Sequence, residues 1–237
     1  MILARDLSVS FSGRTVLGPL SGAFGEGVML VAGPAQSGKT TLLKALCGLV
    51  SPATGSVSVD GLDRASSSRA RAEARAAFGM VFQNDALFDS LDALANVALP
   101  LLRRGVARTE ARERAHEALG QVGLAGHEHA LPERLSGGMR KRLGLARAIV
   151  ARPRYLVADD PFAGLDPGTT ARVRDLLVSL WGEHGGLVVA MADPKPMWPH
   201  ASRALVLDAG AALAWGPAGQ VRADPRVASI CGEEATA

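Results

Sequence analysis

One short segment of this 237-residue sequence constrains its fold more than any other. Residues 33–40 match the pattern G-x-x-x-x-G-K-[ST], between an apolar run at Val28–Ala32 and helical spacing at Thr41–Leu49. Glycines in such a loop let backbone N–H groups converge on phosphate oxygens, and the following helix adds partial positive charge at its N-terminus. The pattern therefore predicts a strand, a phosphate-binding loop and a helix. The residues assigned to nucleotide binding are Gly33, Pro34, Ala35, Gln36, Ser37, Gly38, Lys39, Thr40 and Thr41.

A loop of this kind requires an acidic partner to hold Mg²⁺. Lys39 is predicted to reach the β- and γ-phosphates, and the Thr40 hydroxyl to bind the metal. The apolar run Tyr155–Ala158 predicts a buried strand that ends at Asp159, which we assign to the Mg²⁺ site. The next residue, Asp160, is in the right place to polarise the attacking water.

The composition is that of a folded chain. It contains 48% hydrophobic residues and 21% charged residues, with 26 Lys+Arg against 23 Asp+Glu. This predicts one or two compact domains, and the net charge of +3 is too small to indicate a nucleic-acid partner. Two cysteines without metal-ligand spacing, Cys47 and Cys231, favour a reducing cytosol. We see neither a signal peptide nor an apolar run of about 18 residues that would span a membrane.

Apolar runs alternate with helical stretches along the chain. The strand-like runs are Ile2–Phe11, Val28–Ala32, Val57–Asp60, Tyr155–Ala158, Leu187–Met191 and Ala204–Leu207. Helical patterns dominate residues 85–151, including an amphipathic stretch at Thr109–Val122, and return at Thr170–Trp181. The stretch Arg64–Ala77 reads as a solvated helix or loop. This order predicts an α/β fold with a largely parallel, doubly wound sheet.

A third motif lies between the two phosphate motifs. Residues 135–142 read L-S-G-G-M-R-K-R, and Ser136 is suited to cap the helix that follows. With the motifs above, this order resembles the nucleotide-binding subunit of ABC transporters over nearly the whole chain. The resemblance implies a P-loop NTPase of ABC type, with a RecA-like core, an antiparallel β region and an inserted helical subdomain. It implies a single domain, 1–237, with the core in 1–84 and 152–237 and the helical subdomain in 85–151.

The resemblance also implies roles for further residues. In this family Ser136, Gly137 and Gly138 contact the γ-phosphate of ATP bound to an opposing subunit, so the nucleotide is sandwiched in a dimer. Phe11 matches the aromatic residue that stacks on adenine, and Gln83 matches the glutamine that joins Mg²⁺ to the contact with the membrane partner. We therefore assign Gln83 to the metal and, with Asp160, to catalysis. Residues 163–166, A-G-L-D, match the loop that communicates across the dimer.

A narrower resemblance concerns what is transported. Residues 82–91, 96–101, 137–142 and 224–227 look like those of the ATPases of Mla/MCE-type lipid transporters. This implies a complex at the cytoplasmic face of the inner membrane, in which a permease docks near residues 83–91. The implied partners are that integral-membrane permease, a second ATPase subunit (a homodimer favoured over a heterodimer) and an MCE-type lipid-binding component, without nucleic acid.

Three residues depart from the pattern of an efficient ATPase. Asp160 stands where the family has Glu, Ala192 where it has a His on the γ-phosphate, and Gln36 where a small residue is usual. Because Asp is one methylene shorter than Glu, and a misplacement of about 1 Å can cost on the order of 100-fold, we expect slow hydrolysis. The alternative is a nucleotide-binding, largely non-hydrolysing subunit that completes a partner's site. An ABC-type protein of DNA repair or translation is disfavoured, since such proteins carry two cassettes or long insertions.

Overall fold

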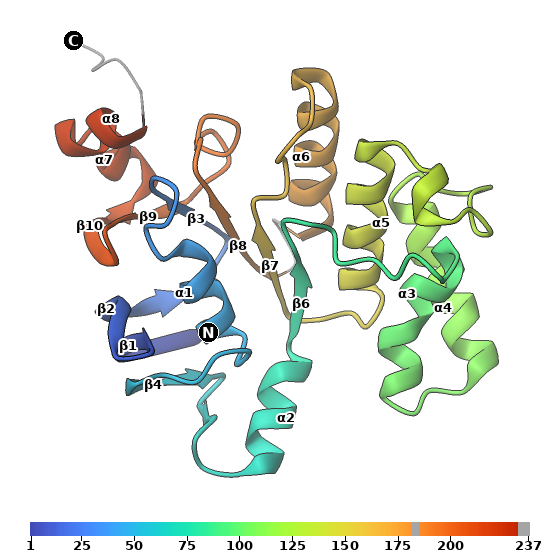
Figure 1. The fold of residues 1–237 in the computed structure, drawn as a ribbon, viewed down its shortest axis with the longest axis horizontal. Helices are drawn as coiled ribbons and strands as arrows, with labels where there is room; N and C mark the ends of the chain where they lie inside the picture. The colour runs from blue at the N-terminus through green and yellow to red at the C-terminus, as the bar shows by residue number, and fades with distance from the viewer. Residues whose placement is uncertain (182–184, 232–237) are drawn as a thin grey trace.

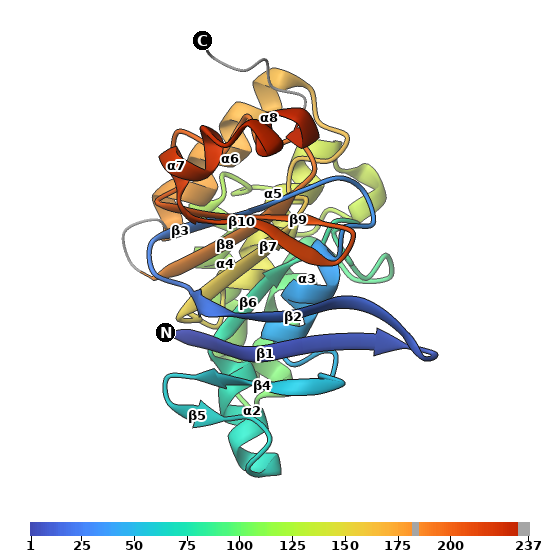
Figure 2. The ribbon, with the colours of Figure 1, turned by 90° about the vertical axis from the view of Figure 1, so that its left-hand side faces the viewer.

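The computed structural model describes residues 1–181 and 185–231, which form two sheets (Figures 1 and 2). The first sheet is antiparallel, in the order β2 (Arg14–Phe24), β1 (Ile2–Phe11), β4 (Thr54–Val59) and β5 (Leu62–Asp63). The second has the order β10 (Ala211–Pro217), β9 (Arg203–Asp208), β3 (Val28–Ala32), β8 (Gly186–Met191), β7 (Tyr155–Asp159) and β6 (Phe78–Val81). Its neighbouring strands are parallel, except for the antiparallel pair β9 and β10.

The central strands of the second sheet are covered on both faces. Every residue of β3, β7 and β8 is buried, which explains why each is a continuous apolar run rather than an alternating one. One face, including Met29 and Val31, packs in a core with α1 (Lys39–Leu46) and the first sheet. The other face, including Val28 and Leu30, packs in a core with the remaining large helices. Helix α1 thus lies between the two sheets, with the phosphate-binding loop at its N-terminus.

The middle of the chain is helical. Helices α3 (Ala93–Arg103), α4 (Arg108–Gln121) and α5 (Gly137–Ile149) pack against one another, away from the antiparallel sheet (Figure 1). The 3₁₀ helix η1 (Pro132–Arg134) precedes α5, and α5 also contacts β6 and α6 (Pro167–Trp181). The short helices α7 (Ala218–Arg222) and α8 (Pro225–Cys231) pack beside β9 and β10. The division into core and helical subdomain at residues 85 and 151 stays a prediction.

The observed elements confirm the predicted fold class, although β2, β6 and β10 were not among the predicted strands. Two further differences concern α1 and the stretch that was predicted to be solvated. Helix α1 begins at Lys39, two residues before the predicted start, because Gly38 takes the N-cap with φ of 99°. The predicted solvated stretch does contain a helix, α2 (Ser68–Ala76), but Arg64 in front of it is buried. Its guanidinium donates hydrogen bonds to the carbonyls of Ala45 and Leu46 at the C-terminus of α1. The prediction of solvent exposure was wrong for Arg64, because orphan helix carbonyls attract a cationic donor.

None of the helices within the described ranges combines the length and apolar content that a bilayer crossing requires.

The packing of α1 predicts a large difference between two leucines three residues apart. Leu46 is fully buried between the sheets, whereas Leu49, just beyond the helix, is 54% exposed. We expect Leu46→Ala to lower the free energy of unfolding by about 2–5 kcal/mol, because it removes buried methyl groups and leaves a cavity. The matched variant Leu49→Ala should change it by less than about 1 kcal/mol. Urea titrations of both variants check this, and equal losses would contradict the described packing.

Candidate nucleotide-binding site

The phosphate-binding loop joins the buried end of β3 to α1. Gly33 has φ of 145°, and a Cβ there would lie 2.1 Å from the Leu207 carbonyl oxygen, so this position excludes any side chain. Lys39 Nζ donates to the carbonyls of Gly33 (2.8 Å) and Pro34 (2.7 Å), closing the loop on itself. Burial lowers the pKa of Lys39, while the negative charges of Asp160 and Asp159 oppose the shift. The ammonium is therefore held, partly desolvated, at the loop that would receive the phosphates.

A small cavity lies beside this loop. Its volume is about 270 Å³, and it is lined by Val16, Gln36, Gly38, Lys39, Thr40 and Thr41. Gln36 has φ of 65°, a left-handed conformation that glycine adopts without strain and that costs other residues about 1–3 kcal/mol. The loop therefore keeps the backbone shape of a glycine-bearing loop although Gln36 replaces the small residue.

Two of the three residues predicted to bind the metal, Thr40 and Asp159, lie together. Asp159 is the last residue of β7 and only 5% exposed, and the Thr40 hydroxyl donates to its Oδ1 at 3.1 Å. Strand β8 separates β7 from β3, but the carboxyl ends of all three parallel strands meet at one edge. Burial raises the pKa of Asp159, opposed by the Thr40 hydrogen bond. A buried carboxylate beside a hydroxyl is a set of hard oxygen ligands, so these residues fit Mg²⁺.

Asp160 and Ala192 lie at the same edge of the sheet. Asp160 follows β7 with φ of 45°, and its backbone N–H donates to the Ala190 carbonyl at 2.7 Å. Burial raises the pKa of Asp160, and the charges of Lys141 and Lys39 oppose the shift. Ala192, which follows β8, contributes only a methyl group where the family pattern has a histidine. A carboxylate is thus available next to the metal-binding residues, without an imidazole at the neighbouring strand end.

The signature residues form a second site, separate from the phosphate loop. Ser136 caps α5, with its Oγ accepting from the Met139 N–H at 3.3 Å, and Gly137 and Gly138 open the helix. A Cβ on Gly138 would lie 2.6 Å from Thr169, so the glycine permits close packing. A cavity of about 630 Å³ adjoins all three residues and the loop before α6, including Asp166. It shares no lining residue with the cavity beside the phosphate loop, so the two cavities, each a candidate half-site, are separate.

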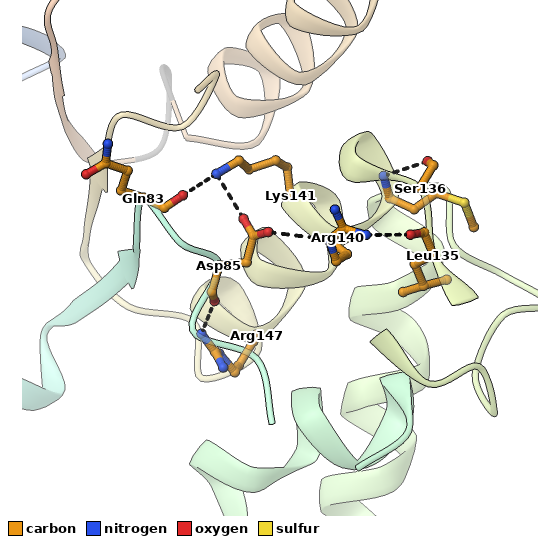
Figure 3. Close-up of polar contacts among 8 residues, drawn as sticks. Gln83, Asp85, Leu135, Ser136, Arg140, Lys141 and Arg147 are labelled. Carbon is orange, nitrogen blue, oxygen red and sulfur yellow. Dashed lines mark hydrogen bonds and ion pairs between the residues drawn. The ribbon is translucent and has the colours of Figure 1, made fainter. Parts of the chain in front are cut away.

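Two further predicted residues lie outside the linings of both cavities. Gln83 follows β6 and is exposed, and its side chain points away from Lys141 in Figure 3. Phe11 ends β1 and is 48% exposed, in the hairpin whose second strand carries Val16 of the small cavity. Neither residue lines the cavity beside the phosphate loop.

Sequence analysis missed the residues that hold the segment around Gln83. Lys141 is only 6% exposed and forms an ion pair with Asp85, with 3.0 Å between Nζ and Oδ1. The helical spacing between Lys141 and the apolar Leu145 places both on the same face of α5, which could have indicated a buried lysine. The identity of its partner, 56 positions earlier in the chain, has no such local signal.

The strand, the G-x-x-x-x-G-K-T loop and the acidic strand end define a P-loop nucleotide-binding protein. A model of the ABC transporter family matches residues 20–163, more than half of the chain. A similar protein is the taurine import ATP-binding protein TauB of Pseudomonas fluorescens (strain Pf0-1), 42% identical over 184 residues, which are 76% of this chain and 67% of TauB. Another is the glycine betaine/proline betaine transport ATP-binding protein ProV of Salmonella typhimurium, 41% identical over 68% of this chain and 41% of ProV.

Solved structures of ABC transporter ATP-binding cassettes are similar to the structure of this chain. The chain is similar to cbiO1 of Clostridium perfringens, part of the ABC transporter complex cbiONQ, with a TM-score of 0.83 and 25% identity over 96% of this chain and 92% of cbiO1. It is also similar to the dimeric ABC transporter cassette MJ0796, with a TM-score of 0.82 and 27% identity over 92% of this chain and 99% of MJ0796. A post-hydrolysis dimer of the same cassette is bound to ADP and Pi.

This chain belongs to the ABC transporter family and is an ATP-binding, energy-coupling subunit of ABC ATPase type. The predicted fold, ATPase activity and cofactors, ATP and Mg²⁺, are confirmed at the level of the family. Subunits of this kind dimerise and act with membrane permease subunits. The relatives named here are taurine and betaine transport proteins, so they give the Mla/MCE resemblance no support.

The shifted pKa of Asp159 predicts that this residue destabilises the metal-free chain. Because its folded pKa is raised, the ionised carboxylate costs stability at neutral pH, and the cost fades as pH falls through the folded pKa towards the unfolded value near 4. Asp159→Asn should therefore be more resistant to urea than the wild type at pH 7 in the presence of a chelator. The difference between their free energies of unfolding should become smaller towards pH 4.

Asp166→Asn is a control at a carboxylate whose pKa is shifted in the opposite direction. Hydrogen bonds from Thr169 lower the pKa of the exposed Asp166, so its carboxylate stabilises the fold above the unfolded pKa and ceases to do so as pH falls. This variant should be no more stable than the wild type at pH 7. A lower stability of Asp159→Asn at pH 7 would contradict the view that Asp159 is an unfavourably buried metal ligand.

Proposed function

We propose that this chain hydrolyses ATP at its own phosphate loop and that the energy drives an importer. The observation that carries this proposal is the contact between the Thr40 hydroxyl and the buried Asp159, with Asp160 next to it. It brings two oxygen ligands suited to Mg²⁺, a hydroxyl and a carboxylate, to the first residues of α1 after the phosphate loop, with a second carboxylate one residue away.

Each residue of the site has a proposed part in the reaction. The N–H groups of residues 33–41 and the Lys39 ammonium hold the phosphates, and Thr40, Asp159 and Gln83 hold Mg²⁺. Mg²⁺ held by these residues would neutralise charge that develops on the phosphate oxygens. Asp160 accepts a hydrogen bond from the attacking water and directs it at the γ-phosphate. Burial raises the pKa of Asp160 and so increases its basicity.

The separation of the two half-sites supports a head-to-tail dimer. Ser136, Gly137 and Gly138 present a capped helix N-terminus to solvent rather than to the phosphate loop of the same chain, so a second subunit is needed to bring both to one ATP. We propose a homodimer in which Phe11 stacks on the adenine. The alternative partner is a better-equipped ATPase, in which case this chain mainly binds nucleotide. Gln36, Asp160 and Ala192 favour that alternative, because all three departures from the family pattern lie in the phosphate half-site of this chain.

The permease would bind beside the segment that follows β6. A cavity of about 430 Å³ lies there between β6, α3 and α5, and its apolar lining includes Phe82, Phe88 and Leu99. Phe88 lines this cavity and is 44% exposed, so it offers apolar surface to a docking helix. We propose that a cytoplasmic helix of the permease fills this cavity, which places the chain at the cytoplasmic face of the membrane.

The substrate of the complex is proposed from the relatives. Taurine and betaines are small zwitterions, and the relatives that share 36–42% identity with this chain carry their names, so we propose import of a small zwitterionic solute. The Mla/MCE resemblance at residues 82–91 and 137–142 favours a lipid and an MCE-type component instead. The two proposed substrate classes predict different stimulation of ATP turnover by the reconstituted complex. A zwitterion importer should respond to taurine or betaine with a binding protein, and a lipid transporter should respond to phospholipid.

The first test of this function is ATP turnover by the purified complex with Lys39→Ala. Because Lys39 is the charged group of the phosphate loop, we expect the variant to lose at least about 100-fold of the Mg²⁺-dependent turnover. Lys44→Ala, on the same helix and half-buried, is the matched control and should keep most of the activity. Substantial turnover that survives Lys39→Ala would assign hydrolysis to another subunit.

A second test of the function changes the length of the side chain at position 160. Asp160→Glu adds the methylene by which this chain differs from the family pattern, so we expect it to raise kcat by about tenfold or more. Asp160→Asn removes the base without changing the size, and should lower kcat by about 100-fold while leaving ATP affinity within threefold. Steady-state kinetics with nucleotide binding measures both. Unchanged turnover in Asp160→Asn would disprove the role given to Asp160.

A further inference from the structure

Helix α5 holds the segment that follows β6 through three backbone carbonyls. Lys141 Nζ donates to the Gln83 carbonyl at 2.5 Å, and the Arg147 guanidinium donates to the carbonyls of Asp85 (2.7 Å) and Ala86 (2.5 Å). Figure 3 shows Gln83, Asp85 and the side chains of α5 in this arrangement. Asp85 and Ala86 have φ of 55° and 49°, in the left-handed region that non-glycine residues rarely adopt. Such a conformation persists only where surrounding contacts impose it, and here side chains of α5 supply them.

Lys141 is the buried centre of these contacts. It is 6% exposed, and its ammonium lies between the Gln83 carbonyl and the carboxylate of Asp85, whose side chain is 16% exposed. A desolvated ammonium is stable only when it is paired and hydrogen-bonded, so breaking either contact leaves a buried charge unsatisfied. The position of the Gln83 backbone is therefore tied to the position of Lys141.

The same carboxylate connects this ion pair to the start of α5. Asp85 Oδ2 lies 3.9 Å from Arg140 Nε, and Arg140 Nη1 donates to the Leu135 carbonyl at 2.7 Å. Leu135 is followed by Ser136, which caps α5 (Figure 3). A continuous series of polar contacts thus runs from Gln83, just after the carboxyl end of β6, to the segment that would contact the ATP of a second subunit.

We propose that Lys141 is a positioning residue that couples Gln83 to the Ser136–Gly138 segment, so that the two half-sites of one chain move together. This inference rests on the proposed function, since it assumes that both segments contact nucleotide. When Gln83 shifts towards bound Mg²⁺–ATP, the hydrogen bond to Lys141 carries the N-terminal turn of α5 with it. A chain without this ammonium would bind ATP but would present its signature residues poorly to the partner.

The first experiment measures ATP binding and turnover of the full complex with Lys141→Met. This variant keeps the length of the side chain and removes its charge and donors. We expect kcat to fall by at least about tenfold, with the ATP dissociation constant within threefold of the wild type. Lys141→Arg, which keeps the charge and the donors, should recover most of the loss. A kcat within twofold of the wild type in Lys141→Met would overturn the proposal.

A second comparison separates positioning from general support of the fold. If Lys141 acts through Gln83, then Lys141→Met should lower kcat less than twofold in a Gln83→Ala background. Arg142→Met is the matched control, because Arg142 also lies on α5 and donates to two backbone carbonyls, those of Val122 and Gly123, but not to the Gln83 segment. Its effect should be equal in both backgrounds. An equal effect of Lys141→Met in both backgrounds would also overturn the proposal.

A third measurement does not depend on turnover or on the folding of one variant. Amide hydrogen exchange of the full complex is followed with and without Mg²⁺–ATPγS, in the wild type and in the doubly neutral Asp85→Asn/Lys141→Met, which leaves no buried charge unpaired. In the wild type, nucleotide should slow exchange at both residues 83–86 and 137–140. In the double variant the phosphate loop should still be protected, but residues 137–140 should not.

Protection of residues 137–140 in both proteins would refute the coupling while leaving the proposed function intact. A wild-type complex that neither binds nor hydrolyses ATP, with Lys39→Ala indistinguishable from it, would instead refute the proposed function itself.

Discussion

The contact between the Thr40 hydroxyl and the Asp159 carboxylate depends on the whole parallel sheet. The two residues are 119 positions apart, and they meet because β3 and β7 both pair with β8 in parallel and end at the same edge. Burial of these strands on both faces fixes their register, since every side chain of β3, β7 and β8 is packed. The cost is a desolvated carboxylate, whose pKa is raised, and the bound metal would offset that cost.

Several strained turns lie in the same region. Gln36 in the phosphate loop, Asp160 after β7, and Asp85 and Ala86 after β6 all have left-handed φ values. These segments follow or adjoin the carboxyl ends of strands, where the chain must turn sharply while still presenting polar groups to one point. Each turn is held by specific contacts, such as the Asp160 N–H on the Ala190 carbonyl. The rigid sheet thus supports loops that would not keep these shapes alone.

The two half-sites of the chain differ in how closely their residues follow the family pattern. The signature helix has its serine cap and closely packed glycines, whereas the phosphate site carries Gln36, Asp160 and Ala192. Gln36 is accommodated, since the loop takes the left-handed conformation in spite of it. Asp160 and Ala192 are different, because a shorter acid and a missing imidazole change the groups available to the reaction rather than the backbone. The ion pair of Lys141 with Asp85 joins the segment after β6 to α5, the helix that Gly137 and Gly138 open.

Local patterns in the sequence determined the strands, the phosphate loop and the residues assigned to Mg²⁺. Val28–Ala32 and Tyr155–Ala158 fitted buried strands better than helices, and the glycines and Lys39 indicated a phosphate loop between strand and helix, because these signals act over a few neighbouring residues. The exposed Arg64 that we predicted proved to be a buried cap of α1, and the partner of Lys141 was not predicted at all. Such contacts join residues far apart in the chain, and only the packing of helices and sheets decides which of them become neighbours.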